Sequence, residues 1–269
     1  MKINKGSVFL CISILLLAVT FFVRAEEVFV SGATKIPPNV LREYSKSYGT
    51  IELKLPMKDS VQLFYVGSGS GFLVDKGDRL VMTAHHIASR AGFMVEKEPS
   101  VDKETAKVFF NGIPLEYVMS LPAADLALFR AERIPDEMEE VSLGKVLVGE
   151  PVYSFARTAF GFLNFTDNDK IEKSMLFFGE LPFTGSVVGV TELFLMDTPT
   201  NYPRNKTGLN YIVINQLPRT GFSGAPAFNT KGEAVGVIVG GEGSFCYLSS
   251  AESIQILLSN YKETISQKK

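Results

Sequence analysis

The stretch Arg219–Asn229, "RTGFSGAPAFN", decides the fold of this chain because it sets a serine among small residues. Ser223 stands directly before Gly224, and Gly221 lies two residues ahead of it. Small neighbours permit a tight turn that exposes the hydroxyl and points backbone N–H groups into one concavity, as an acyl-transfer enzyme requires. Taken alone, the stretch also fits a plain Gly-Ser loop between two strands.

A serine nucleophile needs a general base, and the chain holds only two histidines, His85 and His86 in "RLVMTAHHIA". A histidine base in turn needs an acceptor that fixes its tautomer and stabilises the imidazolium. Asp125 in "PAADLALFR" fits, since it borders an apolar run where an unbonded carboxylate would be costly to bury. Seen alone, Asp125 also fits a solvated strand start. The order His, Asp, Ser is the order found in two-barrel β proteins.

The remaining sequence supports an all-β fold ending in a helix. Short apolar or alternating runs, such as "SVQLFYVGSGSGFLVD" and "GEAVGVIVGGEG", are separated by Gly, Pro, Asn and Asp, which is typical of sandwiches and barrels. The C-terminal stretch differs, because its apolar residues share one helical face behind a cap at Ser249 or Ser250. These residues are Ile254, Leu257, Leu258, Tyr261 and Ile265.

These patterns divide the chain into five parts. We expect a first barrel over 56–140 that carries the histidine and the aspartate, and a second over 141–250 that carries the serine. A helix and tail follow over 251–269, and the polar stretch 26–55 is expected to be an irregular arm. The long aromatic-rich segment 160–211 is expected to form surface loops.

The first part, residues 1–25, has the features of a secretory signal peptide. Two lysines precede the apolar run Ser7–Val23, and cleavage is expected after Ala25. This predicts a secreted or periplasmic protein with no stable membrane insertion after cleavage. An uncleaved membrane anchor is the alternative, although the run is short for a bilayer span.

Composition narrows the choice of partners and cofactors. The chain is 46% hydrophobic and 21% charged with a net charge of -2, and it has no basic stripe, so no nucleic-acid partner is expected. Cys246 is the one cysteine left after signal cleavage, and we expect a small buried hydrophobe without a disulfide. Two adjacent histidines and one cysteine do not match a zinc spacing, so no metal or cofactor is expected. The sequence leaves the oligomeric state open.

Five blocks, in order, resemble chymotrypsin/trypsin-fold serine proteases of the disulfide-free bacterial type. They are "GSGSGFLVD", "VMTAHHIA", "AADLALFR", "TGFSGAPAFN" and "AVGVIVGG". The second, third and fourth are similar to the family's "ILTNNHV", "DLALLK" and "GNSGGPLFN". The likeness includes the protease domain of HtrA/Deg proteins, and no PDZ domain is expected. It implies two six-stranded antiparallel β-barrels with a C-terminal α-helix, and a serine endopeptidase acting on a peptide or protein substrate.

The resemblance also implies a role for each matching residue. The catalytic set is Ser223 as nucleophile, His86 as base and Asp125 as the acid that orients it. The oxyanion hole is formed by the N–H groups of Gly221 and Ser223. The family's Thr-x-x-His spacing, counted from Thr83, assigns the base to His86 and leaves His85 as a neighbour.

The substrate pocket is where the chain departs from the family. Leu217 stands at the pocket base, so an apolar or small P1 side chain is expected. Val239, Gly240 and Gly241 form the pocket strand without the family's aromatic wall. Phe222 replaces the aspartate that pairs with a new N-terminus in animal enzymes. A catalytically silent trypsin-fold envelope binding protein is the alternative function, because fold alone does not fix activity.

Overall fold

The structure is a computed structural model that describes residues 36–56, 63–89, 107–167, 170–191 and 209–267. The expected signal peptide, residues 1–25, lies outside the described residues, as does most of the first half of the expected arm. None of the described helices has the length and apolar character that a membrane crossing needs.

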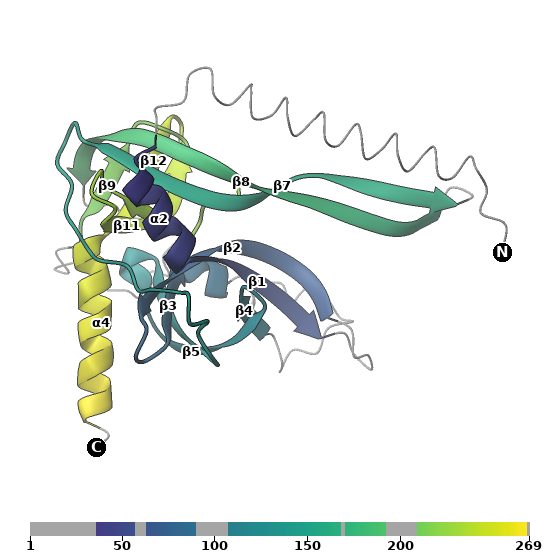
Figure 1. Ribbon diagram of the computed structural model, residues 1–269, viewed down its shortest axis with the longest axis horizontal. Helices are drawn as coiled ribbons and strands as arrows, with labels where there is room; N and C mark the ends of the chain where they lie inside the picture. Colours follow the sequence, from purple (N-terminus) through teal and green to yellow (C-terminus); the bar gives the residue numbers. More distant parts are fainter. Residues whose placement is uncertain (1–35, 57–62, 90–106, 168–169, 192–208, 268–269) are drawn as a thin grey trace. The chain divides into compact units, whose positions relative to one another are not determined.

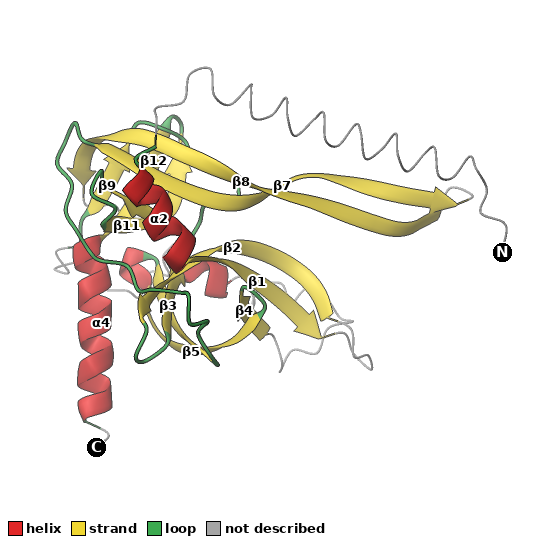
Figure 2. Cartoon of the chain, viewed as in Figure 1, coloured by secondary structure: helices red, strands yellow, loops and turns green. Residues whose placement is uncertain are grey.

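The described strands form two closed antiparallel barrels of six strands each, which confirms the predicted fold class (Figures 1 and 2). The first barrel has the order β1-β2-β3-β6-β5-β4. Its strands are β1 (Tyr48–Pro56), β2 (Leu63–Asp75), β3 (Leu80–Ala84), β4 (Lys107–Phe110), β5 (Ile113–Leu121) and β6 (Leu126–Ala131). Strands β3 and β6 are neighbours although they lie far apart in the sequence, and this pairing brings the histidine block and the aspartate block together.

The second barrel has the order β10-β11-β12-β9-β8-β7. Its strands are β7 (Pro151–Asp167), β8 (Lys170–Thr191), β9 (Tyr211–Ile214), β10 (Pro226–Phe228), β11 (Ala234–Glu242) and β12 (Phe245–Ser250). Apolar side chains from all of these strands fill its interior, among them Ile214, Ile238 and Leu248, which are fully buried. Phe222, from the serine block, belongs to the same core, so the turn before Ser223 is anchored in the second barrel.

The irregular arm expected over 26–55 is wrong for its described part. A helix, α2 (Pro38–Ser47), precedes β1, and β1 is a full member of the first barrel. The helix starts with Pro38, which is favoured in the first turn, and buries Val40 and Tyr44 four residues apart on one face. These two buried hydrophobic side chains hold a mostly polar helix against the rest of the protein. The amino-acid composition of the segment does not show that they are buried.

The surface loops expected within 160–211 are also wrong for their described part. Strands β7 and β8 pair antiparallel from Pro151↔Ser186 to Asp167↔Lys170, forming a hairpin that runs far beyond the barrel (Figure 1). Strand β7 pairs with β10 only near its start, at Tyr153 and Ser154.

The C-terminal helix was predicted, and α4 (Ala251–Ser266) confirms it. The Ser250 side chain caps its N-terminus by accepting a hydrogen bond from Ser253 N at 3.4 Å. Ile254, Leu257 and Tyr261 are buried on one face, as the period of the sequence indicated. The Tyr261 hydroxyl accepts a hydrogen bond of 2.7 Å from Arg130 Nη2 in β6, which ties this helix to the first barrel.

Candidate active site

The ends of β3 and β6 bring His86 and Asp125 together. Their register pairs Ala84 with Leu126, so the residues that follow β3 and precede β6 are neighbours. The helical stretch 85–89 begins directly after β3. A short 3₁₀ turn, η1 (Pro122–Ala124), ends at Asp125, whose backbone takes the left-handed conformation that aspartate tolerates. The backbone therefore places His86 and Asp125 next to each other independently of their side chains.

Both carboxylate oxygens of Asp125 bond to His86. Oδ2 lies 2.6 Å from His86 Nδ1, and Oδ1 accepts a hydrogen bond of 2.8 Å from the His86 backbone N–H. The carboxylate can only accept, so the Nδ1 atom carries the proton and Nε2 is left as the basic atom. The His86 side chain is 27% exposed and that of Asp125 only 10%, which gives an accessible base and a sheltered acid.

The preceding residue, His85, occupies a different environment. Its backbone N–H donates to the Asp125 carbonyl at 2.9 Å, whereas its Nδ1 atom is buried without a hydrogen-bond partner in the described part of the chain. Burial lowers the pKa of His85 below its ordinary value, Asp125 partly opposes this, and His86 adds to it. Of the two histidines, His86 therefore has a carboxylate bonded to its ring, whereas the ring of His85 has none in the described part of the chain.

Tyr211 of β9 supports the aspartate from the second barrel. Its hydroxyl donates a hydrogen bond of 2.7 Å to the carbonyl of Ala123, within the turn that ends at Asp125. Burial, and to a smaller extent the charge of Asp125, raise the pKa of Tyr211, so the hydroxyl remains a donor. The sequence offered no signal for this residue, because Tyr211 reads only as a core position of a strand.

The serine block forms a turn suited to an oxyanion hole. Phe222 N donates to Arg219 O at 3.3 Å, and Gly221 has φ +98°, which together define a type II turn. Glycine is favoured at this third position because the conformation requires a positive φ. Among the described residues, the N–H groups of Gly221 and Ser223 have no partner, so both are available to a substrate oxygen.

The serine loop packs directly onto the strand that leads to the base. Ser70 N in β2 donates to Ser223 O at 2.8 Å, and Gly224 has φ +85°. A Cβ at Gly224 would lie 2.1 Å from Ser70 O and 2.3 Å from Thr83 Oγ1. Ser223 is thus held beside the segment that carries His86. No hydrogen bond of the described chain joins Ser223 Oγ to His86, and such catalytic bonds often tighten only when substrate binds.

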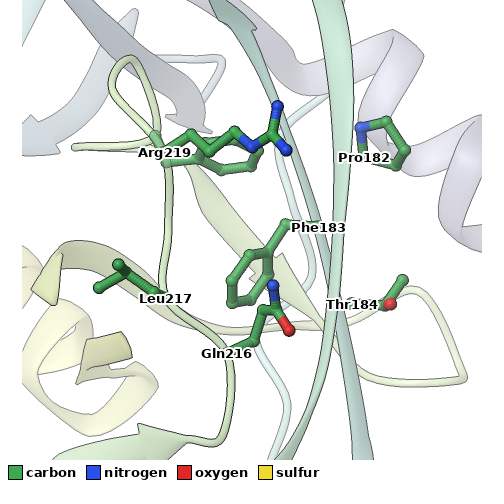
Figure 3. A pocket seen from close by; sticks show the side chains of 7 residues that line it. Pro182, Phe183, Thr184, Gln216, Leu217 and Arg219 are labelled. Carbon is green, nitrogen blue, oxygen red and sulfur yellow. The ribbon is translucent and has the colours of Figure 1, made fainter. Parts of the chain in front are cut away.

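The expected substrate-pocket residues separate into two groups. Leu217 lines a pocket of about 160 Å³ together with Arg219 and Phe222 of the serine block and Phe183 of β8. Figure 3 shows Leu217 and Arg219 on one side of this pocket and Pro182 and Thr184 of β8 on the other. Val239, Gly240 and Gly241 are not among its lining residues. Leu217 nevertheless meets the pocket strand, because a Cβ at Gly241 would lie 3.0 Å from Leu217 Cδ1 and 2.5 Å from Pro218 Cδ.

Cys246 and the possible metal ligands are weaker candidates for a functional site than the serine turn. Cys246 is a free, buried cysteine in β12, as the sequence indicated, and burial raises the pKa of its thiol. A neutral, buried thiol is a poor nucleophile. Within the described residues, no group of three or more His, Cys, Asp or Glu side chains is placed to hold a metal ion.

Comparison with known families agrees with this geometry. The family model for a trypsin-like peptidase domain matches residues 69–237, which is more than half of the chain. The match begins in the glycine-rich strand β2 and ends in β11, and it contains His86, Asp125 and Ser223. No curated protein is significantly similar to the chain.

Proposed function

The chain belongs to the trypsin-like peptidase domain family, and we propose on this premise that it is a serine endopeptidase. The catalytic groups in this proposal are Ser223, His86 and Asp125. One observation carries it: the His86–Asp125 pair, in which the two carboxylate oxygens hold the ring Nδ1 at 2.6 Å and the backbone N–H at 2.8 Å. This arrangement leaves Nε2 as a base directed away from the carboxylate.

The proposed reaction proceeds through an acyl-enzyme. Ser223 Oγ attacks the carbonyl carbon of the scissile peptide while His86 Nε2 takes the hydroxyl proton. The N–H groups of Gly221 and Ser223 stabilise the negative oxygen of the tetrahedral intermediate. His86 then gives the proton to the departing amine, and the ester remains on Ser223. A water, deprotonated by His86, hydrolyses that ester and restores the serine.

The substrate is proposed to be a peptide or protein with an apolar or small P1 side chain. The support is the close approach of Leu217 and Pro218 to Gly241. This approach leaves little room for a substrate side chain between these two residues and the pocket strand. We further propose that the protein is made with a signal peptide cleaved after Ala25 and works as a secreted or periplasmic enzyme. N-terminal sequencing of the exported protein tests this, and a chain that keeps residues 1–25 would instead support a membrane anchor.

A catalytically silent envelope binding protein is the second candidate. It is favoured by one observation, that no hydrogen bond joins Ser223 Oγ to His86 in the described part of the chain. A cleft that never brings these two groups together would retain the fold without the chemistry.

A fluorophosphonate probe separates the two candidates, because it reacts only with an activated serine. We expect the folded chain that starts after Ala25 to be labelled, and Ser223→Ala to remain unlabelled. Ser259→Ala is the matched control, since this serine is exposed on α4 and its loss should leave labelling unchanged. Absence of labelling in the folded wild type would contradict the protease and support the silent binding protein.

A further inference from the structure

Ser70 of β2 forms hydrogen bonds to the serine turn through both its backbone and its side chain. The residue is fully buried, and its backbone N–H bonds to the carbonyl of Ser223 at 2.8 Å. Its hydroxyl donates to the carbonyl of Gly221, also at 2.8 Å, and its own carbonyl accepts from Thr83 Oγ1 at 2.7 Å. One serine of β2 therefore holds the carbonyls on both sides of Phe222, directly beside the proposed nucleophile.

The bonds beyond Ser70 have a defined direction. The Tyr48 hydroxyl lies 3.1 Å from Ser70 Oγ, and Arg157 N donates to the Tyr48 hydroxyl at 2.8 Å. A hydroxyl has a single proton, and that of Ser70 is given to a carbonyl, which can only accept. Tyr48 must therefore donate to Ser70. The chain runs from Arg157 N–H through Tyr48 and Ser70 to the Gly221 carbonyl, with every member acting as donor to the next.

We propose that Tyr48 and Ser70 are positioning residues for the oxyanion turn of this enzyme. The inference rests on the proposed peptidase function. The peptide between Gly221 and Phe222 is held on both edges, because its carbonyl bonds to Ser70 and its N–H bonds to Arg219 O. The Gly221 N–H belongs to the neighbouring Thr220–Gly221 peptide, and its direction relative to the held peptide is set by the backbone of Gly221, whose φ is +98°. Hydrogen bonds aligned in one direction also strengthen one another.

The chain of bonds links the oxyanion turn to two peripheral elements. Tyr48 lies where α2 ends and β1 begins, and its ring contacts that of Tyr44 with 4.5 Å between centroids. Arg157 lies in β7 beyond the residues that pair with β10, near the base of the long hairpin. The turn orientation therefore depends on a helix and a hairpin that contain none of the proposed catalytic residues.

The pair Tyr44 and Tyr48 supplies a matched experiment. Both rings are in one aromatic cluster, but the Tyr44 hydroxyl is buried without a hydrogen-bond partner in the described chain. Tyr48→Phe should slow fluorophosphonate labelling about fivefold to tenfold, as expected for one lost hydrogen bond expressed in the transition state. Tyr44→Phe should label at the wild-type rate. On any peptide the enzyme cleaves, the Tyr48→Phe loss should fall on kcat, with KM unchanged.

Ser70→Ala and the double variant Tyr48→Phe/Ser70→Ala complete the test. Because the two hydroxyls act in series, the double variant should label no more slowly than Ser70→Ala alone. Multiplying losses, or equal labelling of Tyr48→Phe and Tyr44→Phe, would overturn the inference while leaving the peptidase proposal intact. A wild type that is folded and unlabelled would overturn the peptidase proposal itself. Thermal melting of each variant shows that a slower rate is measured on folded protein.

Discussion

Asp125 and the two histidines show how much is determined at the scale of single residues. His85 and His86 are adjacent in the sequence, yet only His86 has a carboxylate against its ring. The spacing from Thr83 predicted which histidine this would be, and the order of blocks predicted Asp125 as its partner. The sequence could not predict that the His85 Nδ1 atom is buried without a hydrogen bond, because this depends on which residues pack around the turn.

The histidine assignment gives the first residue-scale prediction. His86→Ala should lower kcat/KM by about 10⁴-fold or more, because the serine then has no base. His85→Ala should keep most of the activity, since the bond from His85 to the Asp125 carbonyl is made by the backbone N–H, which alanine retains. Steady-state kinetics on one cleaved peptide compare the two, and equal losses would contradict the assignment of the base.

The second residue-scale prediction concerns pH. Burial holds the pKa of folded His85 below 6.5, so the unfolded chain takes up a proton before the folded chain does. The contribution of His85 is therefore fully retained above 6.5 and is lost as pH falls toward its lower folded pKa. In urea titrations, wild type should lose more stability below 6.5 than His85→Asn does. An identical pH dependence in both proteins would refute this role of burial.

At the scale of elements, sequence patterns succeeded where they depend on local periodicity. The helical period of Ile254, Leu257 and Tyr261 predicted α4, and strand-end blocks predicted the residues that meet between β3 and β6. The polar segment before Tyr48 was misread, because only two of the residues that α2 buries, Val40 and Tyr44, are hydrophobic. The β7–β8 hairpin was missed because its strands continue to pair past the barrel, and a strand's own sequence does not show which strand it pairs with.

Gly224 provides the element-scale prediction, because it lies where the serine loop meets β2 and β3. Gly224→Ala combines a positive φ with a Cβ that would lie 2.1 Å from Ser70 O, so it should lower the free energy of unfolding by about 3 kcal/mol or more. Gly149→Ala is the matched control. Its φ of +92° is similar, but nothing lies within 4 Å of the added atom, so about 1 kcal/mol is expected.

Urea denaturation of both glycine variants measures the difference between them. The additional loss of unfolding free energy at Gly224 measures how closely the serine loop approaches β2 and β3, because backbone strain is common to both variants. Equal destabilisation of the two variants would show that the loops separate readily, and the tight packing of Ser223 beside the His86 segment would then not hold in solution.

At the scale of the molecule, the proposed site is divided between the two barrels. His86 follows β3 and Asp125 precedes β6, both in the first barrel, and Ser223 precedes β10 of the second. Hydrogen bonds join the two halves at several places, among them Ser70 N to Ser223 O and Tyr211 to Ala123 O, and the Arg130–Tyr261 bond ties α4 to the first barrel. The residues from Pro37 to Lys269 accordingly form one compact unit. Sequence blocks point to the proposed catalytic groups, but these crossing contacts emerge only from the packed structure.

The Arg130–Tyr261 bond tests whether α4 helps to hold the barrels together. The Tyr261 ring is buried and lies 5.9 Å from the Arg130 guanidinium, so Tyr261→Phe keeps the packing and removes only the hydroxyl acceptor. A lost bond to a charged donor should lower the free energy of unfolding by about 1–2 kcal/mol. If the helix couples the barrels, far-UV circular dichroism and fluorophosphonate labelling should be lost at the same, lower urea concentration, in a single transition.

The control for this last prediction is Thr264→Ala on the same helix. Thr264 is exposed and its hydroxyl bonds only within α4, to Asn260 O, so its loss should change the urea midpoint little. An unchanged midpoint in Tyr261→Phe would mean that the hydroxyl bond contributes nothing to stability. Labelling lost well before the circular dichroism signal would mean that the barrels separate before either unfolds, so that the site depends on docking alone.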